Sequence, residues 1–118
     1  MHNFKELKVW QRARVLVKNI YILTATFPST EKYNLCSQMQ SCSVSLMSTI
    51  AEGSGRGSDI DFARFLDMSL GSAHELESQL IVSFDLEYLS EDKLQNLTSD
   101  LSEIQRMIVA LIKKLRNN

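Results

Sequence analysis

The clearest pattern in the sequence is a regular spacing of hydrophobic residues near its end. Leucine and isoleucine recur in alternating steps of three and four, at Leu94, Leu97, Leu101, Ile104, Ile108, Leu111 and Leu115. This spacing places one apolar stripe along an α-helix and is typical of left-handed, coiled-coil-like packing. Ser90 precedes the stripe, where a serine hydroxyl can cap the first turn. The pattern predicts a helix over residues 91–116.

Three earlier segments show the same helical spacing. We expect helices over residues 4–27, 30–52 and 59–88. Their apolar stripes are, in chain order, Leu7, Trp10, Ala13, Val17, Ile20 and Leu23; Leu35, Met39, Cys42, Leu46 and Ile50; and Phe62, Leu66, Ser69, Ala73, Leu76 and Leu80. Ser58 is expected to cap the third helix. Four helices joined by short loops predict an all-α fold, a left-handed, antiparallel up-down-up-down four-helix bundle forming one domain over residues 1–118.

The chain has only four glycines and one proline, and three of the glycines fall in the stretch AEGSGRGS at 51–58. This stretch follows a predicted helix rather than a strand, and its spacing matches neither a dinucleotide fingerprint nor a P-loop. We interpret it as a corner between helices, with Gly53 in the left-handed conformation that ends many helices. The fourth glycine, Gly71, interrupts a predicted helix, so we expect a neighbouring helix to approach it closely.

The second predicted helix is unusual because it has no charged residue between Leu35 and Ala51. An outer helix of a monomeric bundle normally keeps a charged face, whereas interface cores lose charge and gain methionine. We therefore predict that this helix contacts both its own bundle and another copy of the chain; the alternative is a neutral face in water. The predicted oligomer-interface residues are Leu35, Met39, Gln40, Ser41, Cys42, Leu46 and Ile50.

Charge is distributed unevenly although the formal net charge is only −1. Residues 1–30 and 104–118 are basic, and most acids lie between them. In the predicted topology the start of the first helix, the glycine corner and the end of the last helix meet at one end of the bundle. This end collects the predicted nucleic-acid-binding residues Lys5, Lys8, Arg56, Lys113, Lys114 and Arg116, which can attract phosphates. The alternative is that basic residues near a helix C-terminus complement its dipole.

Other chemistry has little support in the sequence. Cys36 and Cys42 are too far apart along one helix for a disulfide, which predicts two free, buried thiols. His2 and His74 do not complete a zinc motif or the Glu-x-x-His pairs of a di-iron bundle, and His74 has no nucleophile beside it in the sequence. We predict no catalytic residues, no cofactor and no metal, and therefore no enzyme. Without a membrane-spanning or signal segment, we expect a cytoplasmic protein.

Several motifs resemble one known family along nearly the whole chain. They are FKELKVWQRA at 4–13, FP at 27–28, EKYNLCSQM at 31–39, IAEGSGR at 50–56 and FARFLDMSLGSAHELESQL at 62–80. These segments resemble the bacterial four-helix-bundle proteins encoded within 23S rRNA intervening sequences. The resemblance implies an antiparallel four-helix bundle that assembles as a homopentamer. A related protein, the accessory variability protein of diversity-generating retroelements, is similar in fold and works with a reverse transcriptase and nucleic acid.

The sequence departs from this family at a few positions. Relatives usually have two arginines where this chain has Gln40 and Ser41, and an asparagine where it has Thr49. If the arginines contact RNA in relatives, that contact is lost here; if they serve an interface, neutral groups have replaced them. Glu52 and Arg56 of the family motif are retained.

These observations lead to three functional hypotheses. The first is a non-enzymatic, self-associating scaffold, a homopentamer by resemblance, with weak RNA or ribonucleoprotein association through the basic end. The second is a protein-binding adaptor without nucleic-acid contact. The third is a small-ligand binder that uses the central cavity of a ring of subunits.

Overall fold

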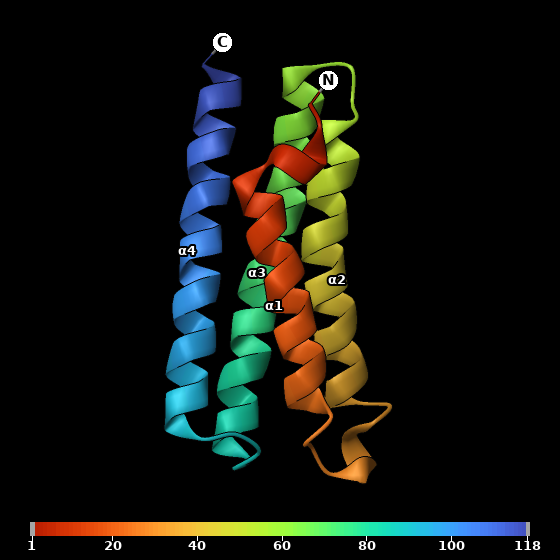
Figure 1. Cartoon of the computed structure of the whole chain (residues 1–118), viewed down its shortest axis with the longest axis vertical. Coiled ribbons are helices and arrows are strands. Elements are labelled where there is room, and N and C mark those ends of the chain that lie inside the picture. The colour runs from red at the N-terminus through yellow and green to blue at the C-terminus, as the bar shows by residue number, and fades with distance from the viewer. Residues whose placement is uncertain (1, 118) are drawn as a thin grey trace.

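The four predicted helices are present and pack against one another in an all-helical fold (Figure 1). The computed structural model describes residues 2–117. The elements are the short 3₁₀ helices η1 (Phe4–Glu6) and η2 (Ser29–Glu31) and the α-helices α1 (Lys8–Thr24), α2 (Leu35–Ser54), α3 (Asp59–Asp85) and α4 (Glu91–Arg116). Successive helices run in opposite directions and form a bundle 46 Å long, which confirms the predicted fold class. None of the helices formed by residues 2–117 is both long and apolar enough to cross a membrane.

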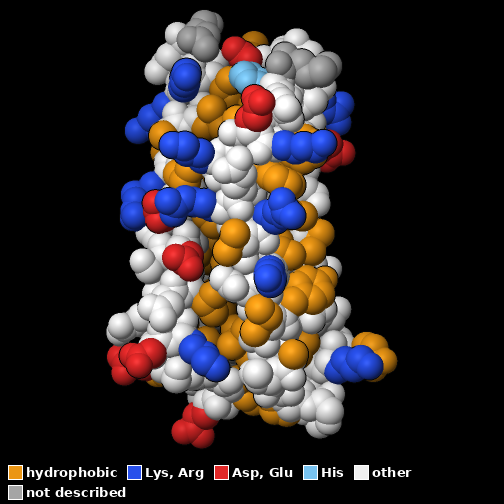
Figure 2. All heavy atoms as spheres, in the orientation of Figure 1, with side chains coloured by type: hydrophobic (Ala, Val, Ile, Leu, Met, Phe, Trp, Pro, Cys, Tyr) orange, Lys and Arg blue, Asp and Glu red, His pale blue; other side chains and the backbone are white. Residues whose placement is uncertain are grey.

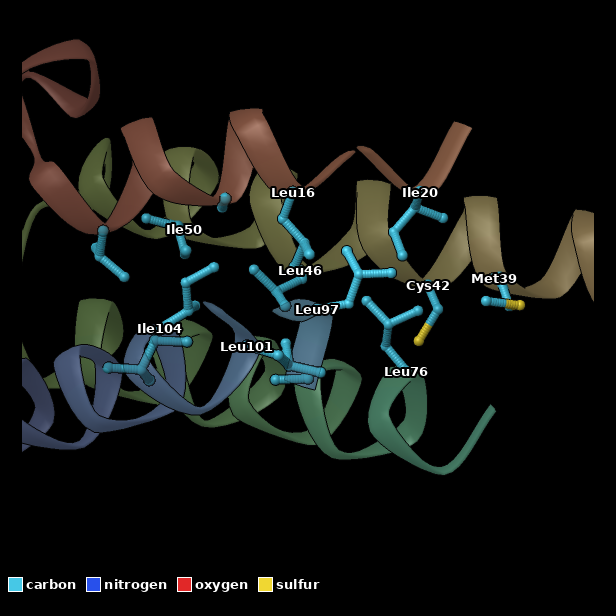
Figure 3. Packing of buried hydrophobic residues seen from close by; sticks show 14 of the residues in the cluster. Leu16, Ile20, Met39, Cys42, Leu46, Ile50, Leu76, Leu97, Leu101 and Ile104 are labelled. Carbon is cyan, nitrogen blue, oxygen red and sulfur yellow. The ribbon is translucent and has the colours of Figure 1, made fainter. Parts of the chain in front are cut away.

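The core follows the predicted stripes closely in α3 and less closely in α1. All six stripe positions of α3 are buried. In α1, Val9 and Leu16 are buried in place of Leu7, Trp10 and Val17, which are half-buried. The predicted apolar stripe of α1 is therefore rotated slightly around the helix axis relative to the face that is buried. Figure 3 shows side chains from all four helices, among them Leu16, Leu46 and Leu101, directed into the shared interior.

The predicted helix boundaries are wrong in the first three helices, and α1 spans Lys8–Thr24 rather than residues 4–27. The second helix begins at Leu35 rather than at residue 30, because Asn34 has a backbone conformation (φ −115°, ψ −103°) that interrupts the helical turn. The third helix ends at Asp85 because Glu87 adopts a left-handed conformation with φ 65°. There Tyr88 N donates to Ser83 O and Glu87 N donates to Phe84 O, both at 2.9 Å. This pair of bonds is a Schellman motif, which satisfies carbonyls at a helix end.

Both expectations about the glycines are wrong. Gly53 lies inside α2, and no glycine among residues 2–117 has a positive φ. The position instead requires a small residue, since an added Cβ would lie 2.6 Å from Cβ of Phe65 and 3.1 Å from Cδ1 of Phe62. Gly71 is exposed, and an added Cβ would meet nothing within 4 Å, so no helix of this chain approaches it.

The seam between α2 and α3 is built from small polar side chains. Ser69 Oγ donates to Leu46 O across the seam at 3.1 Å and also bonds Thr49 Oγ1. Further along, the hydroxyls of Ser45 and Ser72 lie 3.2 Å apart. Small side chains let two helix backbones approach closely while their hydroxyls remain hydrogen-bonded. The absence of charge between Leu35 and Ala51 is thus explained in part by packing within the chain.

Candidate nucleic-acid interface

The N-terminal segment is fastened to one end of the bundle. His2 N donates to Ser54 O at 2.9 Å, and Gln11 Nε2 donates to Lys5 O at 2.8 Å. The rings of Phe4 and Trp10 meet edge to face with centroids 4.9 Å apart. These contacts hold η1 against the bundle beside the α2–α3 corner and define the position from which Lys5 extends.

The six residues of the predicted basic end lie at this same end of the bundle (Figure 1). η1, the α2–α3 corner and the last turn of α4 meet there, and Lys5, Lys8, Arg56, Lys113, Lys114 and Arg116 are all exposed. Their surroundings nevertheless differ. The Arg116 guanidinium is bonded to Asp67, and the guanidinium carbon of Arg56 lies 4.4 Å from the ring centroid of Phe65.

The four lysines of the basic end are less engaged than the two arginines. Within residues 2–117, Lys5, Lys8, Lys113 and Lys114 have no ion-pair partner. Lys113 lines a groove between α3 and α4. Lys114 lies eleven residues after Glu103. Eleven residues are close to three full turns at 3.6 residues per turn, so the two side chains lie on the same face of α4. Because Glu103 pairs with Arg12 of α1 at 2.5 Å, Lys114 lies on the α1 side of α4.

The basic surface extends further along α1 than predicted. Arg12, Arg14 and Lys18 are exposed, and α1 contains no acidic residue. We call Lys5, Lys8, Arg12, Arg14, Lys18 and Lys114 the basic strip; along α1, from Lys8 to Lys18, it spans about 15 Å at 1.5 Å per residue. Figure 2 shows Lys and Arg side chains over the upper half of this face, with hydrophobic surface between them.

Sequence reasoning missed part of this surface although a signal was present. The imbalance between the basic residues of the first segment and Glu6, its one acid, pointed to α1. The predicted binding residues include only the basic residues at the end of the bundle and omit Arg12, Arg14 and Lys18. Their exposure shows that cations continue along the outer face of the helix rather than stopping at its start.

The predicted interface residues of α2 do not form one surface. Met39, Cys42, Leu46 and Ile50 are 0 to 5 % exposed and belong to the core of their own chain. These four cannot contact another copy, because the bundle itself covers an amphipathic helix on its apolar side.

The other three predicted interface residues lie nearer the surface. Leu35 and Gln40 are half-buried, and Gln40 Nε2 donates to Thr24 Oγ1 at 3.0 Å. Ser41 is exposed. The exposed, uncharged surface of α2, which we call the neutral face, consists of Ser37, Gln38, Ser41, Ser45 and Ser48.

The two cysteines are free and buried, as predicted. Burial raises the pKa of the Cys42 thiol to about 12, with a smaller contribution from the nearby Glu75 carboxylate. The pKa of Cys36 is also raised, first by burial and then by Glu31. A thiol that keeps its proton at neutral pH is a weak nucleophile and a poor metal ligand.

Titratable side chains form no further cluster in the described part of the chain. His74 is exposed and lies 4.0 Å from Glu77 through Nδ1. Among residues 2–117, no group of three or more His, Cys, Asp or Glu side chains is arranged to hold a metal ion.

Comparison with known proteins gives two related findings. Residues 5–110 match the family model described as 23S rRNA-intervening sequence protein. A crystal structure of a protein of unknown function from the S23 ribosomal protein family of Bacteroides thetaiotaomicron superposes with a TM-score of 0.81. The two share 21 % sequence identity, and the match covers 89 % of this chain and 95 % of the other. At that identity the likeness establishes the fold. The sequence has no match among curated proteins.

Proposed function

Because this chain belongs to the 23S rRNA-intervening sequence protein family, we propose that it is a non-enzymatic, self-associating scaffold that binds RNA through the basic strip. The observation that carries the proposal is the exposure of six cations on η1, α1 and the end of α4. Phosphate contacts of this kind release counterions and supply sequence-independent affinity for nucleic acid.

The distribution of acids favours contact through this surface alone. Most carboxylates lie on α3 and on the first half of α4, where they would repel a phosphate backbone. On the strip itself, Glu103 is engaged by Arg12, and α1 contributes no carboxylate. A chain with a net charge of −1 thus presents a local positive potential that can orient an approaching polyanion.

Self-association is supported by the neutral face of α2. Five exposed positions on this helix carry serine or glutamine and no charge, whereas the outer faces of α1 and α4 are charged. Charged residues are depleted from the cores of protein interfaces. The family resemblance makes a homopentamer the expected assembly. Repetition of the strip around a ring would strengthen weak RNA contacts through multivalency.

Titration of a labelled RNA across a salt series tests the proposal. We expect the affinity to fall steeply with salt, and Lys8→Glu and Lys114→Glu each to weaken binding and reduce the slope of log K against log salt by about 0.7 per lost phosphate contact. Lys93→Glu is the matched control, because it makes the same charge change at an exposed site at the other end of the bundle.

Two results would contradict RNA binding through the strip. One is the absence of binding at low salt; the other is an equal loss for Lys93→Glu and Lys8→Glu. Absence of binding at low salt favours the second function, a protein-binding adaptor that uses the neutral face of α2.

A further inference from the structure

A groove opens at the end of the bundle opposite to the two chain termini. It lies between the last turns of α1, the η2 segment and the first turns of α2, and has a volume of about 640 Å³. Six of its lining side chains have groups suited to ligand binding: Tyr21, Thr24, Lys32, Tyr33, Ser37 and Gln40. No carboxylate lines this groove.

Two tyrosines on the groove are unusually accessible. Tyr21 is 47 % exposed and Tyr33 is 82 % exposed, so each ring presents much of its surface to water. The Lys32 ammonium lies 5.3 Å from the centroid of the Tyr33 ring. The groove therefore combines accessible aromatic faces with a positive charge, the two features by which single-stranded nucleic acid is held.

The polar groups of the groove are held in place. Gln40 Nε2 donates to Thr24 Oγ1 at 3.0 Å, and Thr24 Oγ1 donates to Ile20 O at 2.9 Å. This chain of bonds fixes the Gln40 amide at the groove and leaves its carbonyl oxygen as an acceptor for a base amino group. The nearby carboxylate of Glu31 accepts a hydrogen bond at 2.8 Å from the Tyr88 hydroxyl.

The groove is continuous with the basic strip. Arg14, Lys18 and Tyr21 are spaced four and three residues apart, which places them on one face of α1. All three are exposed. A strand whose phosphates follow Arg14 and Lys18 would therefore reach Tyr21 within about one more helical turn.

We propose that this groove binds an unpaired base of single-stranded RNA, with the base stacked on Tyr33 or Tyr21 and its edge hydrogen-bonded to Gln40. Lys32 contacts the adjoining phosphate, and the backbone continues along the basic strip. The inference rests on the proposed RNA binding and adds a preference for single-stranded over double-stranded RNA. A duplex keeps its bases stacked inside the helix, so no base is available to the tyrosines.

Fluorescence anisotropy with a labelled single strand of about twelve nucleotides and with the matching duplex tests this site. We expect removal of the ring that stacks on the base, by Tyr33→Ala or by Tyr21→Ala, to weaken single-strand binding at least about fivefold, since one base–aromatic stack contributes that much affinity. Duplex affinity and the salt slope stay unchanged, because no phosphate contact is lost. Tyr33→Phe, which keeps the ring, is the matched control and binds like the unmodified chain.

The outcomes separate this inference from the proposal on which it rests. If Lys8→Glu weakens binding but the tyrosine variants do not, the groove is not a base site and the strip alone binds RNA. If the unmodified chain binds no RNA, both fail. If Tyr33→Ala changes the mass of the protein in light scattering and weakens single strands and duplexes equally, the tyrosines serve assembly and the inference is overturned. Circular dichroism of the variants confirms folding.

Discussion

Gly53 and Gly71 show how one residue type has opposite consequences at two positions. An added Cβ at Gly53 would be forced against Cβ of Phe65, whereas one at Gly71 would enter open space. We expect Gly53→Ala to destabilise the fold by about 1–3 kcal/mol through overpacking. Gly71→Ala should stabilise it by about 0.5–1 kcal/mol, because alanine is the better helix former. Urea denaturation measures both; equal effects would contradict the packing argument.

The raised pKa of Cys42 predicts that the stability of the fold depends on pH. Its pKa is about 12 in the folded chain, against an ordinary value of 9.0. Between these values the unfolded chain releases the thiol proton more readily than the folded one, so the free energy of unfolding falls as pH rises. We expect a loss of about 1 kcal/mol between pH 8 and pH 10 from this group. Urea denaturation of Cys42→Ala, compared with the unmodified chain, should show a weaker pH dependence; identical curves would contradict it.

At the scale of elements, the end of α3 carries a strained residue. Glu87 holds a left-handed conformation that costs a non-glycine residue about 1–2 kcal/mol. We expect Glu87→Gly to raise the free energy of unfolding by up to about 1 kcal/mol, because glycine adopts this conformation without a Cβ clash. Glu91→Gly, in the first turn of α4, is the control and should lower stability. Thermal unfolding distinguishes them, and a destabilised Glu87→Gly variant would show that the glutamate side chain contributes more than the strain costs.

Helix spacing predicted the elements well and their ends less well. The stripes of α3 and α4 repeat over many turns, so each additional apolar residue reinforced the same face. The start of α2 and the end of α3 depend on the backbone angles of Asn34 and Glu87. Asn34 belongs to a residue type that commonly precedes a helix, but the prediction placed the start earlier; Glu87 belongs to a type that marks no boundary in the sequence.

At the scale of the whole molecule, Ser41→Glu tests self-association. Ser41 is exposed in the folded chain, so a glutamate there should leave the stability of a single subunit within about 0.5 kcal/mol. In an assembly that buries the neutral face, the same charge is desolvated without a partner and should break the oligomer. Ser99→Glu on the exposed face of α4 is the matched control. Multi-angle light scattering measures the mass; an unchanged mass for Ser41→Glu would exclude the neutral face as the contact.

The candidate site was predictable in part. The end of the bundle at which Lys5, Arg56 and Lys114 gather follows from helix order alone, because alternate helix ends meet in an up-down bundle. Arg116, one of the predicted binding residues, is paired with Asp67, so its charge is already compensated within the chain. This contact depends on the rotation of α4 against α3. The groove of Tyr21 and Tyr33 was not predicted, since these residues lie on separate elements and no short motif connects them.

The sequence by itself determined the number of helices, their order and the faces that α2, α3 and α4 bury, because these properties depend on local periodicity and on short connections. Only the tertiary structure decided how each side chain is used. It placed Met39 and Leu46 in the core of their own chain and Gly53 at a close helix contact. These outcomes depend on the relative rotation and distance of packed helices, which many residues set together and which no single stretch of sequence encodes.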